Sequence, residues 1–477
     1  MTTNLDLTPE LRTKLLDHLL EELETYYGKT GELRVAPDLD LEKIIGAVRS
    51  FDLRKPVKGE IALDAVLNGL IEHTVHTPHP MYYGLYNPRA NFAGILADLI
   101  TAVLNPQLAA WSHSPYANEV ERYLVETFGK LFGYSAASTD GVFASGGAEA
   151  NFTAILCALN HAFPEVGEKG IQGISKKPLI YCSEQTHHSI QKGARMAGLG
   201  SASVRTIEVD ENLKMSVDKL TSCILEDKKK GFAPIMVVAT AGTTGTGTID
   251  HLEKIGKLCE AHQIWYHVDA AYGGATVVNP ELKQWIKGIE TSHSLIVDLH
   301  KWFSVPMATS LFITQDSQIL HRTFRIQTGY MPKDAVNLEI TDPFTHSFQW
   351  SRRFSGLKIY LSLLLYGMEG YADVIGNQVE MGGKLRTLLI RDGWTLKNHT
   401  PLPVLCFTDT TLSVDPGFTK HICDTLVKSG EAWISVYPIG QEEVLRACIT
   451  NYHTDVSHLT RLVKLLGNAR EAYQVRK

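Results

Sequence analysis

The stretch SLIVDLHKWF, residues 294–303, decides how the rest of the chain is interpreted. Its apolar start predicts a buried strand, yet the strand leads directly to Lys301, a residue type that is seldom buried without a partner. One interpretation is a surface lysine at the end of a strand. The other is a lysine that the fold places in a functional site, and the remaining sequence must choose between them.

The segment between residues 140 and 315 alternates short apolar runs with helical segments. This alternation is typical of a mostly parallel sheet covered by helices, so we predict an α/β fold with a seven-stranded sheet and helices on both faces. Ligands of such sheets bind at the carboxyl ends of the strands, and Lys301 follows one of these ends. The predicted strands are GVFAS (141–145), PLIYCS (178–183), VRTIEV (204–209), PIMVVATAG (234–242), IWYHVDAA (264–271), SLIVDLH (294–300) and TSLFIT (309–314).

Two flanking segments differ from this central part. Leucines recur at three- and four-residue spacing in LRTKLLDHLLEELETYY (11–27), which predicts a helix with a face suited to a partner subunit. Near the C-terminus, strands and helices mix in a segment of ordinary domain size. We therefore predict a helical N-terminal dimerisation segment at 1–85, a large α/β domain at 86–373 and a small α+β domain at 374–477.

The composition excludes several function classes. The 477 residues carry a net charge of -6 with both signs mixed along the chain, so no basic stripe indicates nucleic-acid binding. Seven cysteines without a CxxC pair predict reduced thiols, a cytoplasmic setting and no metal site. The acidic, helical N-terminus does not resemble a signal peptide, and no apolar run approaches the roughly 20 residues of a membrane span.

Three of the predicted strands end in unusual residues. In ASGGAEAN (144–151), Gly146, Gly147 and Ala148 lie between a strand and a helix, where free backbone N–H groups suit a phosphate; the alternative is a tight turn chosen for packing. In SEQTHHSI (183–190), His187 has no cluster of other metal ligands beside it. The stretch ATAGTTGTGTID (239–250) lacks the glycine spacing of a dinucleotide site.

Asp269 lies inside the apolar strand of WYHVDAAYGG (265–274). A carboxylate in such a place costs several kcal/mol unless a cation or a donor meets it. A structural salt bridge with Lys301 would satisfy it. A cofactor with a phosphate, a carbonyl for the lysine and a ring nitrogen for the carboxylate would explain all of these residues together, and pyridoxal phosphate (PLP) has these three groups.

The order of the glycine-rich loop, S-x-Q-x-H, HVDAAYGG and HKW closely resembles the group II PLP-dependent decarboxylases, which act on aromatic amino acids, histidine, glutamate or cysteine sulfinate. The resemblance extends from HPMYYGLYNP (79–88) to EVLRACITNY (443–452) and implies a fold-type I, PLP-dependent transferase-like fold. It implies cofactor contacts at matching positions: Lys301 as the Schiff-base lysine, Asp269 at the ring nitrogen, His187 and Ala271 on the two ring faces, Thr244 near the ring and the substrate carboxylate, and Gly146, Gly147, Ala148 and His300 at the phosphate.

The chain departs from the family beside the lysine. The family often has Asn-Pro before His-Lys, whereas this chain has Asp298 and Leu299. An acid fits poorly against a phosphate. We therefore expect the Asp298 side chain to point away from the site.

The family also carries a mobile loop whose tyrosine protonates the substrate carbon, and Tyr330 matches that tyrosine. The neighbouring Gly329 and Pro332 are consistent with a lid that excludes water. Phenylalanine at this position accompanies aldehyde formation, so Tyr330 favours simple decarboxylation to an amine. The alternative is an ordinary surface tyrosine.

The family builds its substrate pocket where this chain has Leu85, Tyr86, Trp111 and Met307, an apolar and aromatic set that favours an aromatic L-amino acid. Around Leu85 and Trp111, Arg89 is the one arginine or lysine that could meet a side-chain carboxylate. Alternatives are a decarboxylase of another amino acid (aliphatic, glutamate, aspartate, diaminobutyrate or cysteine sulfinate type) or a PLP lyase or aldehyde synthase of the same fold. The resemblance further implies a homodimer with shared active sites.

Overall fold

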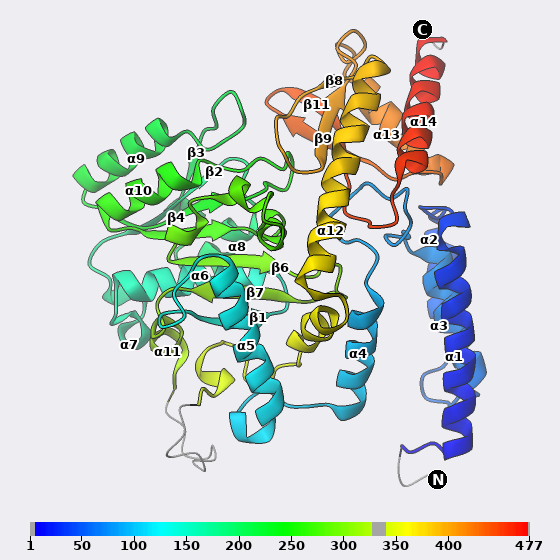
Figure 1. Ribbon diagram of the computed structural model, residues 1–477, viewed down its shortest axis with the longest axis horizontal. Coiled ribbons are helices and arrows are strands. Elements are labelled where there is room, and N and C mark those ends of the chain that lie inside the picture. Colours follow the sequence, from blue (N-terminus) through cyan, green and yellow to red (C-terminus); the bar gives the residue numbers. More distant parts are fainter. Residues whose placement is uncertain (1–4, 327–339, 476–477) are drawn as a thin grey trace.

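The computed structural model describes residues 5–326 and 340–475. Its centre is a seven-stranded sheet in the order β1-β7-β6-β5-β4-β2-β3, in which only β7 runs against the others (Figure 1). This confirms the predicted mostly parallel sheet. The strands are β1 Asp140–Ala144, β2 Pro178–Ser183, β3 Val204–Ile207, β4 Ala233–Thr240, β5 Trp265–Asp269, β6 Ser294–Asp298 and β7 Ser310–Thr314.

Successive residues of each central strand are buried on opposite faces, which explains their nearly continuous apolar sequence. Val237 belongs to the core on one face, whereas Met236 and Val238 belong to the core on the other. Helices cover both faces, as predicted. One face packs against α6 Gly147–Ala162, α8 Ser189–Met196 and α11 Ile319–Phe324; the other packs against α5 Pro115–Leu131, α9 Val217–Lys229, α10 Leu252–His262 and α12 Gly356–Arg391.

The small C-terminal part is an antiparallel sheet in the order β10-β11-β9-β8, covered by two helices. Its elements are β8 Thr395–Leu396, β9 Val404–Thr408, α13 Phe418–Ser429, β10 Ser435–Ile439, β11 Glu442–Cys448 and α14 Val456–Val475. The long helix α12 leads from the large sheet to this small one (Figure 1). The expected boundary at residue 374 lies within α12, and the division into domains stays a prediction.

The N-terminal part consists of three helices, α1 Pro9–Lys29, α2 Leu41–Val48 and α3 Gly59–His73. Figure 1 shows them standing together in dark blue, away from the seven-stranded sheet. None of the three helices contains a buried residue. The next helix, α4 Phe92–Leu104, packs against α12.

The remaining helical segments are short: α7 Val166–Lys169 and the 3₁₀ turns η1 Thr30–Glu32, η2 Trp111–His113, η3 Ile171–Gly173, η4 Ser201–Ser203, η5 Gly273–Val278, η6 Lys283–Ile286, η7 Ile289–Thr291 and η8 Pro343–Thr345. Across the described residues, no helix combines the length and apolar character that crossing a bilayer requires.

Candidate active site

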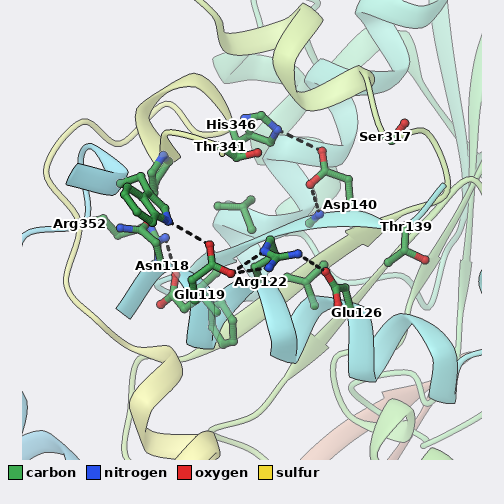
Figure 2. A pocket seen from close by; sticks show the side chains of 17 residues that line it. Asn118, Glu119, Arg122, Glu126, Thr139, Asp140, Ser317, Thr341, His346 and Arg352 are labelled. Atoms are coloured by element: carbon green, nitrogen blue, oxygen red, sulfur yellow. Dashed lines mark hydrogen bonds and ion pairs between the residues drawn. The ribbon is translucent and has the colours of Figure 1, made fainter. Parts of the chain in front are cut away.

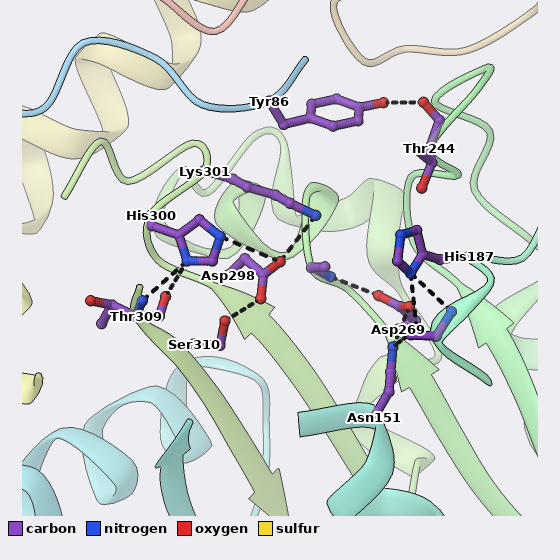
Figure 3. A network of polar contacts seen from close by, with 12 residues as sticks. Tyr86, Asn151, His187, Thr244, Asp269, Asp298, His300, Lys301, Thr309 and Ser310 are labelled. Carbon is purple, nitrogen blue, oxygen red and sulfur yellow. Dashed lines mark hydrogen bonds and ion pairs between the residues drawn. The ribbon is translucent and has the colours of Figure 1, made fainter. Parts of the chain in front are cut away.

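The carboxyl ends of β4, β5 and β6 meet at one edge of the sheet. Thr240 pairs with Asp269 across β4 and β5, and Asp298 is the last residue of β6. The chain turns after Asp298, which returns Lys301 over the same edge (Figure 3). The functional interpretation of Lys301 therefore agrees with its position, because Lys301 lines one cavity together with the strand-end residues Asp269 and Asp298.

Lys301 forms an ion pair with Asp298, whose Oδ2 lies 3.0 Å from Nζ. The Asp298 side chain is 3% exposed, and Ser310 Oγ donates a hydrogen bond to its Oδ1. The expectation that Asp298 points away from the site is wrong. Its residue is fixed at the end of β6, opposite Ser310 of β7, so its carboxylate faces the lysine rather than solvent.

The charge on Asp298 is stabilised by its neighbours. Burial alone would raise the pKa of Asp298, but the positive charge of Lys301, the nearby His300 and the hydrogen bonds from Ser310 and Lys301 outweigh burial and lower the pKa below its ordinary value. Asp298, which was expected to point away from the phosphate site, is therefore held there as a carboxylate.

His300 is buried beside this pair. Its Nδ1 lies 2.9 Å from the carbonyl oxygen of Thr309, and its Nε2 lies 4.0 Å from Asp298 Oδ2. Burial lowers the pKa of His300, so its ordinary state at neutral pH is the uncharged imidazole. The backbone N–H of Thr309 also donates to Nδ1, at 3.2 Å.

Asp269 receives a hydrogen bond on each carboxylate oxygen. Asn151 Nδ2 donates to Oδ2 at 2.9 Å, and the backbone N–H of Ala271 donates to Oδ1 at 3.1 Å. Among the described residues, Lys301 forms its ion pair with Asp298 and not with Asp269. The salt bridge that the sequence proposed between Asp269 and Lys301 is thus replaced by one between Asp298 and Lys301.

The glycine-rich loop leads from β1 into α6, whose first N–H groups have no carbonyl partner within the helix. A side chain at Gly147 would not fit, because a Cβ there would lie 2.9 Å from Asp298 Oδ2. The backbone of Gly147 and Ala148 therefore approaches the cavity closely. This is the local geometry that binds a phosphate at a helix N-terminus.

Residues from the small sheet complete the other side of the site. The buried Arg446 of β11 donates hydrogen bonds to the carbonyl oxygens of Thr244, Gly245 and Gly84. Tyr86 donates to the carbonyl oxygen of Thr244 at 2.9 Å, and its ring lies 5.5 Å from Lys301 Nζ. The loop after β4 is therefore held against Tyr86 by an arginine from the other end of the chain.

These residues enclose a cavity of about 200 Å³. It brings together most of the side chains that the sequence singled out. Its lining consists of Tyr86, Gly147, Ala148, Asn151, His187, Thr240, Gly242, Thr244, Asp269, Ala271, Tyr272, Asp298 and Lys301.

Other predicted residues are not brought to this cavity within the single chain. Leu85 is 54% exposed and Met307 is 62% exposed. Trp111 donates from Nε1 to Glu119 and lines a different cavity. Tyr330 lies outside the described residues.

That different cavity, of about 240 Å³, lies between the start of α5 and the segment around Thr341 (Figure 2). Its charged groups are mostly paired with one another, although Asp140 Oδ2 and two guanidinium nitrogens of Arg352 are buried without a hydrogen-bond partner in the described part of the chain. The ion pairs are Arg122 with Glu119 and Glu126, Arg352 with Glu121, and His346 with Asp140. The smaller cavity at Lys301 is therefore the better candidate, because charged groups of several strands converge on it.

Sequence reasoning missed three side chains of this site: Asn151, His267 and Arg446. A signal for one of them was present, because Trp265, His267 and Asp269 alternate along β5 and must share one face of the sheet. Arg446 had no such signal, since its role depends on how the small sheet docks. Within the described residues, no group of three or more His, Cys, Asp or Glu side chains could hold a metal ion.

Comparison with known proteins supports the same interpretation. Residues 49–408 match the model of the pyridoxal-dependent decarboxylase conserved domain. The chain belongs to this decarboxylase family. It is a PLP-dependent carboxy-lyase that acts on an amino acid, which confirms the predicted enzyme class and cofactor.

Two relatives and one solved structure illustrate the range of the family. The aromatic-L-amino-acid decarboxylase of Bacillus atrophaeus is 27% identical over 81% of this chain and 80% of its own. The histidine decarboxylase of Drosophila melanogaster is 29% identical over 93% of this chain and 53% of its own. The structure of Oryza sativa TDC with PLP and tryptamine superposes with a TM-score of 0.93 at 21% identity, covering 99% of this chain and 100% of that one, and confirms the predicted fold class.

The decarboxylase cavity has the donor set that PLP requires. The open N-terminus of α6 suits the phosphate, Asp269 offers an acceptor for a protonated ring nitrogen, and Lys301 offers the amine. Gly147 leaves the space that a Cβ would fill. The residues present therefore fit the cofactor, and two carboxylates lie near the phosphate end: Asp298 beside Gly147, and Glu149 in the first turn of α6.

Proposed function

We propose that this decarboxylase converts an aromatic L-amino acid to the corresponding amine and CO2. The observation that carries the proposal is the composition of the cavity: Tyr86 forms one wall, Tyr272 lies 4.2 Å behind it between ring centroids, and Lys301 is the one Lys or Arg among the described lining residues. A glutamate or cysteine-sulfinate side chain would lack a cationic partner there. The aromatic-amino-acid decarboxylase among the relatives supports this choice.

Each residue predicted for the cofactor site has a proposed role, including Gly146 and His300, which do not line the cavity itself. Lys301 supplies the amine that binds the cofactor carbonyl, and Asp269 keeps the ring nitrogen protonated. Bound PLP supplies an electron sink for the bond that breaks. Gly146, Gly147, Ala148 and His300 hold the phosphate, His187 and Ala271 lie on the two ring faces, and Thr244 lies near the substrate carboxylate.

The proton that replaces CO2 is proposed to come from Tyr330. Its phenol is a suitable general acid once water is excluded from the closed site. Because Tyr330 lies outside the described residues, this role rests on the match to the family. In sequence, Tyr330 follows the end of α11 at Phe324, and α11 packs against the same face of the sheet as α6.

We also propose that the enzyme is a homodimer. Helices α1 and α3 present exposed leucines, and no residue of either helix is buried in the single chain. Apolar patches of this extent are seldom left open to solvent. Exposed apolar side chains of α1, α3 and α4 include Leu16, Leu20, Leu23, Ile61, Val66, Leu70, Leu99, Val103 and Leu104.

A shared active site follows naturally from such a dimer. Leu85, Trp111 and Met307 do not line the Lys301 cavity of their own chain, and Leu85 and Met307 are more than half exposed. We propose that they complete the substrate pocket across the subunit interface. The seven free cysteines, five of them buried, are in keeping with a reducing, cytoplasmic setting.

The substrate is tested with the PLP-loaded enzyme and a panel of L-amino acids that includes tyrosine, phenylalanine, tryptophan, DOPA, histidine, glutamate, cysteine sulfinate and leucine. We expect CO2 release to have its highest kcat/KM with an aromatic member. A clear preference for glutamate, cysteine sulfinate or leucine would overturn the proposal.

Product analysis tests Tyr330 separately. The wild type should yield amine and CO2, whereas Tyr330→Phe should shift the product toward aldehyde while substrate binding persists. An unchanged amine yield in Tyr330→Phe would exclude the proposed protonation role without affecting the substrate assignment.

A further inference from the structure

A chain of buried polar side chains lies beneath the cavity, on the face of the sheet that α6 covers. Trp265, His267 and Asp269 alternate along β5, so their side chains point to this face. His267 pairs across the sheet with Ser294 of β6. Asn151 reaches the same face from α6, one turn beyond the glycine-rich loop.

The direction of these hydrogen bonds is fixed at one end by Trp265. The indole Nε1–H can only donate, and it lies 2.9 Å from Ser294 Oγ. Ser294 Oγ accepts this bond, and its own O–H can donate to His267 Nδ1, at 2.8 Å. Burial lowers the pKa of His267 to about 3, so this imidazole is neutral and carries its single proton on Nε2.

The same direction continues to the carboxylate. His267 Nε2 lies 3.0 Å from Asn151 Oδ1 and donates to it. The amide nitrogen of Asn151 then faces Asp269 Oδ2 at 2.9 Å (Figure 3). As a carboxylate, Asp269 can only accept hydrogen bonds. It is therefore a suitable end for a chain of donors that begins at Trp265.

A branch from Asn151 reaches His187. Asn151 Nδ2 also donates to Ser189 Oγ at 2.9 Å, and Ser189 Oγ lies 2.9 Å from His187 Nδ1. The backbone N–H of Ser189 donates to the same Nδ1 at 3.2 Å. Because a backbone N–H cannot accept, His187 Nδ1 must be the unprotonated nitrogen, and Nε2 carries the proton.

We propose that this one-way chain, from Trp265 through Ser294 and His267 to Asn151, positions Asp269 and, through the Ser189 hydroxyl, the imidazole of His187. Asn151 is the positioning residue that joins the two, because both of its amide N–H groups are used. The inference rests on the proposed contact of Asp269 with the PLP ring nitrogen. Without the chain, Asp269 would lose the hydrogen bond from Asn151. Its carboxylate could then rotate out of the plane that suits the PLP ring nitrogen.

The first test measures PLP affinity by equilibrium dialysis. Asn151→Leu keeps the shape of the side chain and removes both branches; we expect PLP to bind about 10- to 100-fold more weakly, the usual effect of losing a hydrogen bond to a buried charge. His267→Phe should weaken PLP binding less, because Asn151 remains. His267→Gln, which places an amide N–H near the former Nε2, should restore affinity to within a few-fold of wild type.

Tyr134→Phe is the matched control. It removes a buried hydrogen bond of 2.6 Å to Ser292, two residues from Ser294, and has no link to Asp269. We expect it to lower the free energy of unfolding without weakening PLP binding. Equal effects of Tyr134→Phe and Asn151→Leu on PLP affinity would show a merely structural role and overturn the proposal.

The second test does not involve the cofactor. Nitrogen NMR of the ¹⁵N-histidine-labelled protein, with His187 assigned by His187→Gln, should show a protonated Nε2 and an unprotonated Nδ1. Asn151→Leu should leave the backbone bond to Nδ1 and change the Nδ1 shift through the freed Ser189 hydroxyl. A protonated Nδ1 in the wild type would contradict the chain.

Asp269→Asn separates this inference from the proposed function. If Asp269→Asn binds PLP as tightly as wild type, the proposed role of Asp269 fails. If Asp269→Asn weakens binding but Asn151→Leu does not, the role of Asp269 stands and the positioning chain is wrong.

Discussion

The carboxyl edge of the large sheet and the N-terminal helices are stabilised in opposite ways. At the sheet edge, Asp269 and Asp298 are buried and every carboxylate oxygen named above has a partner from the same chain. In α1, α2 and α3, not one residue is buried. Figure 1 shows this contrast, with the sheet enclosed by helices and the first three helices standing apart.

The difference indicates which part of the enzyme is complete in one chain. The cofactor cavity draws its charged groups from the end of each strand and from the small sheet, so a single chain can form it. The N-terminal helices have apolar faces that only a further surface can bury. Changes at the edge should alter cofactor binding, whereas changes in the helices should alter association.

The largest effect is expected for Lys301→Ala. Removing the amine should abolish the visible absorbance band of the covalently held cofactor and reduce decarboxylation to background, because no other amine lines the described cavity. The oligomeric state should not change. Persistence of the band in Lys301→Ala would show that the covalent site lies elsewhere.

Two charges placed on the N-terminal helices should instead change the oligomeric state. Leu16→Glu with Leu20→Glu places two carboxylates on the exposed face of α1, and each leucine buried in an interface is worth about 2 kcal/mol or more when it belongs to a hot spot. We expect sedimentation analysis to show dissociation to single chains at micromolar protein. Glu24→Gln, on the same helix, should sediment as wild type. A double variant that remains a dimer would place the interface on another surface.

A single methyl group at the glycine-rich loop should have a smaller effect. Gly147→Ala places a Cβ 2.9 Å from Asp298 Oδ2, so the loop or the carboxylate must move, and we expect PLP affinity to fall about tenfold. Gly146→Ala adds a Cβ that meets nothing within 4 Å. The loss of PLP affinity in Gly146→Ala, measured by the same equilibrium dialysis, should be clearly smaller than that in Gly147→Ala. Equal losses of PLP affinity in the two variants would contradict the steric explanation.

Much of the fold could be predicted from the sequence because the central strands are buried on both faces. Runs such as PIMVVATAG contain little besides apolar residues, and each of the seven predicted runs overlaps a strand of the observed sheet. The short strand β8 was missed, because two residues carry no periodic signal. Its pairing with β9 arises from tertiary contacts.

The site could be predicted where its residues lie at or after the end of a strand. It could not be predicted where a residue depends on how the small sheet packs against the large one. Lys301, Asp269 and His187 each follow or end a strand, and the structure brings them to one cavity. Arg446 holds the loop at Thr244 from another sheet, which no local pattern indicates. Asp298 was misjudged because the sequence shows an acid beside an anion site but does not show that Lys301, His300 and Ser310 surround it.

That misjudged residue supplies the smallest predicted effect. The folded-state pKa of Asp298 lies below its ordinary value of 3.8, so its charge stabilises the fold above that pH, and the contribution is lost as the pH falls through the folded-state pKa. In the cofactor-free protein, Asp298→Asn should lower the free energy of unfolding by about 1–3 kcal/mol at pH 7, and the difference from wild type should shrink as the pH is lowered below 4. Ser310→Ala removes the hydrogen bond but keeps the charge, so its smaller loss should persist at pH 5. Denaturant unfolding at pH 7, 5 and 3 distinguishes the two, and a difference for Asp298→Asn that grows on acidification would mean that Lys301 does not stabilise this carboxylate.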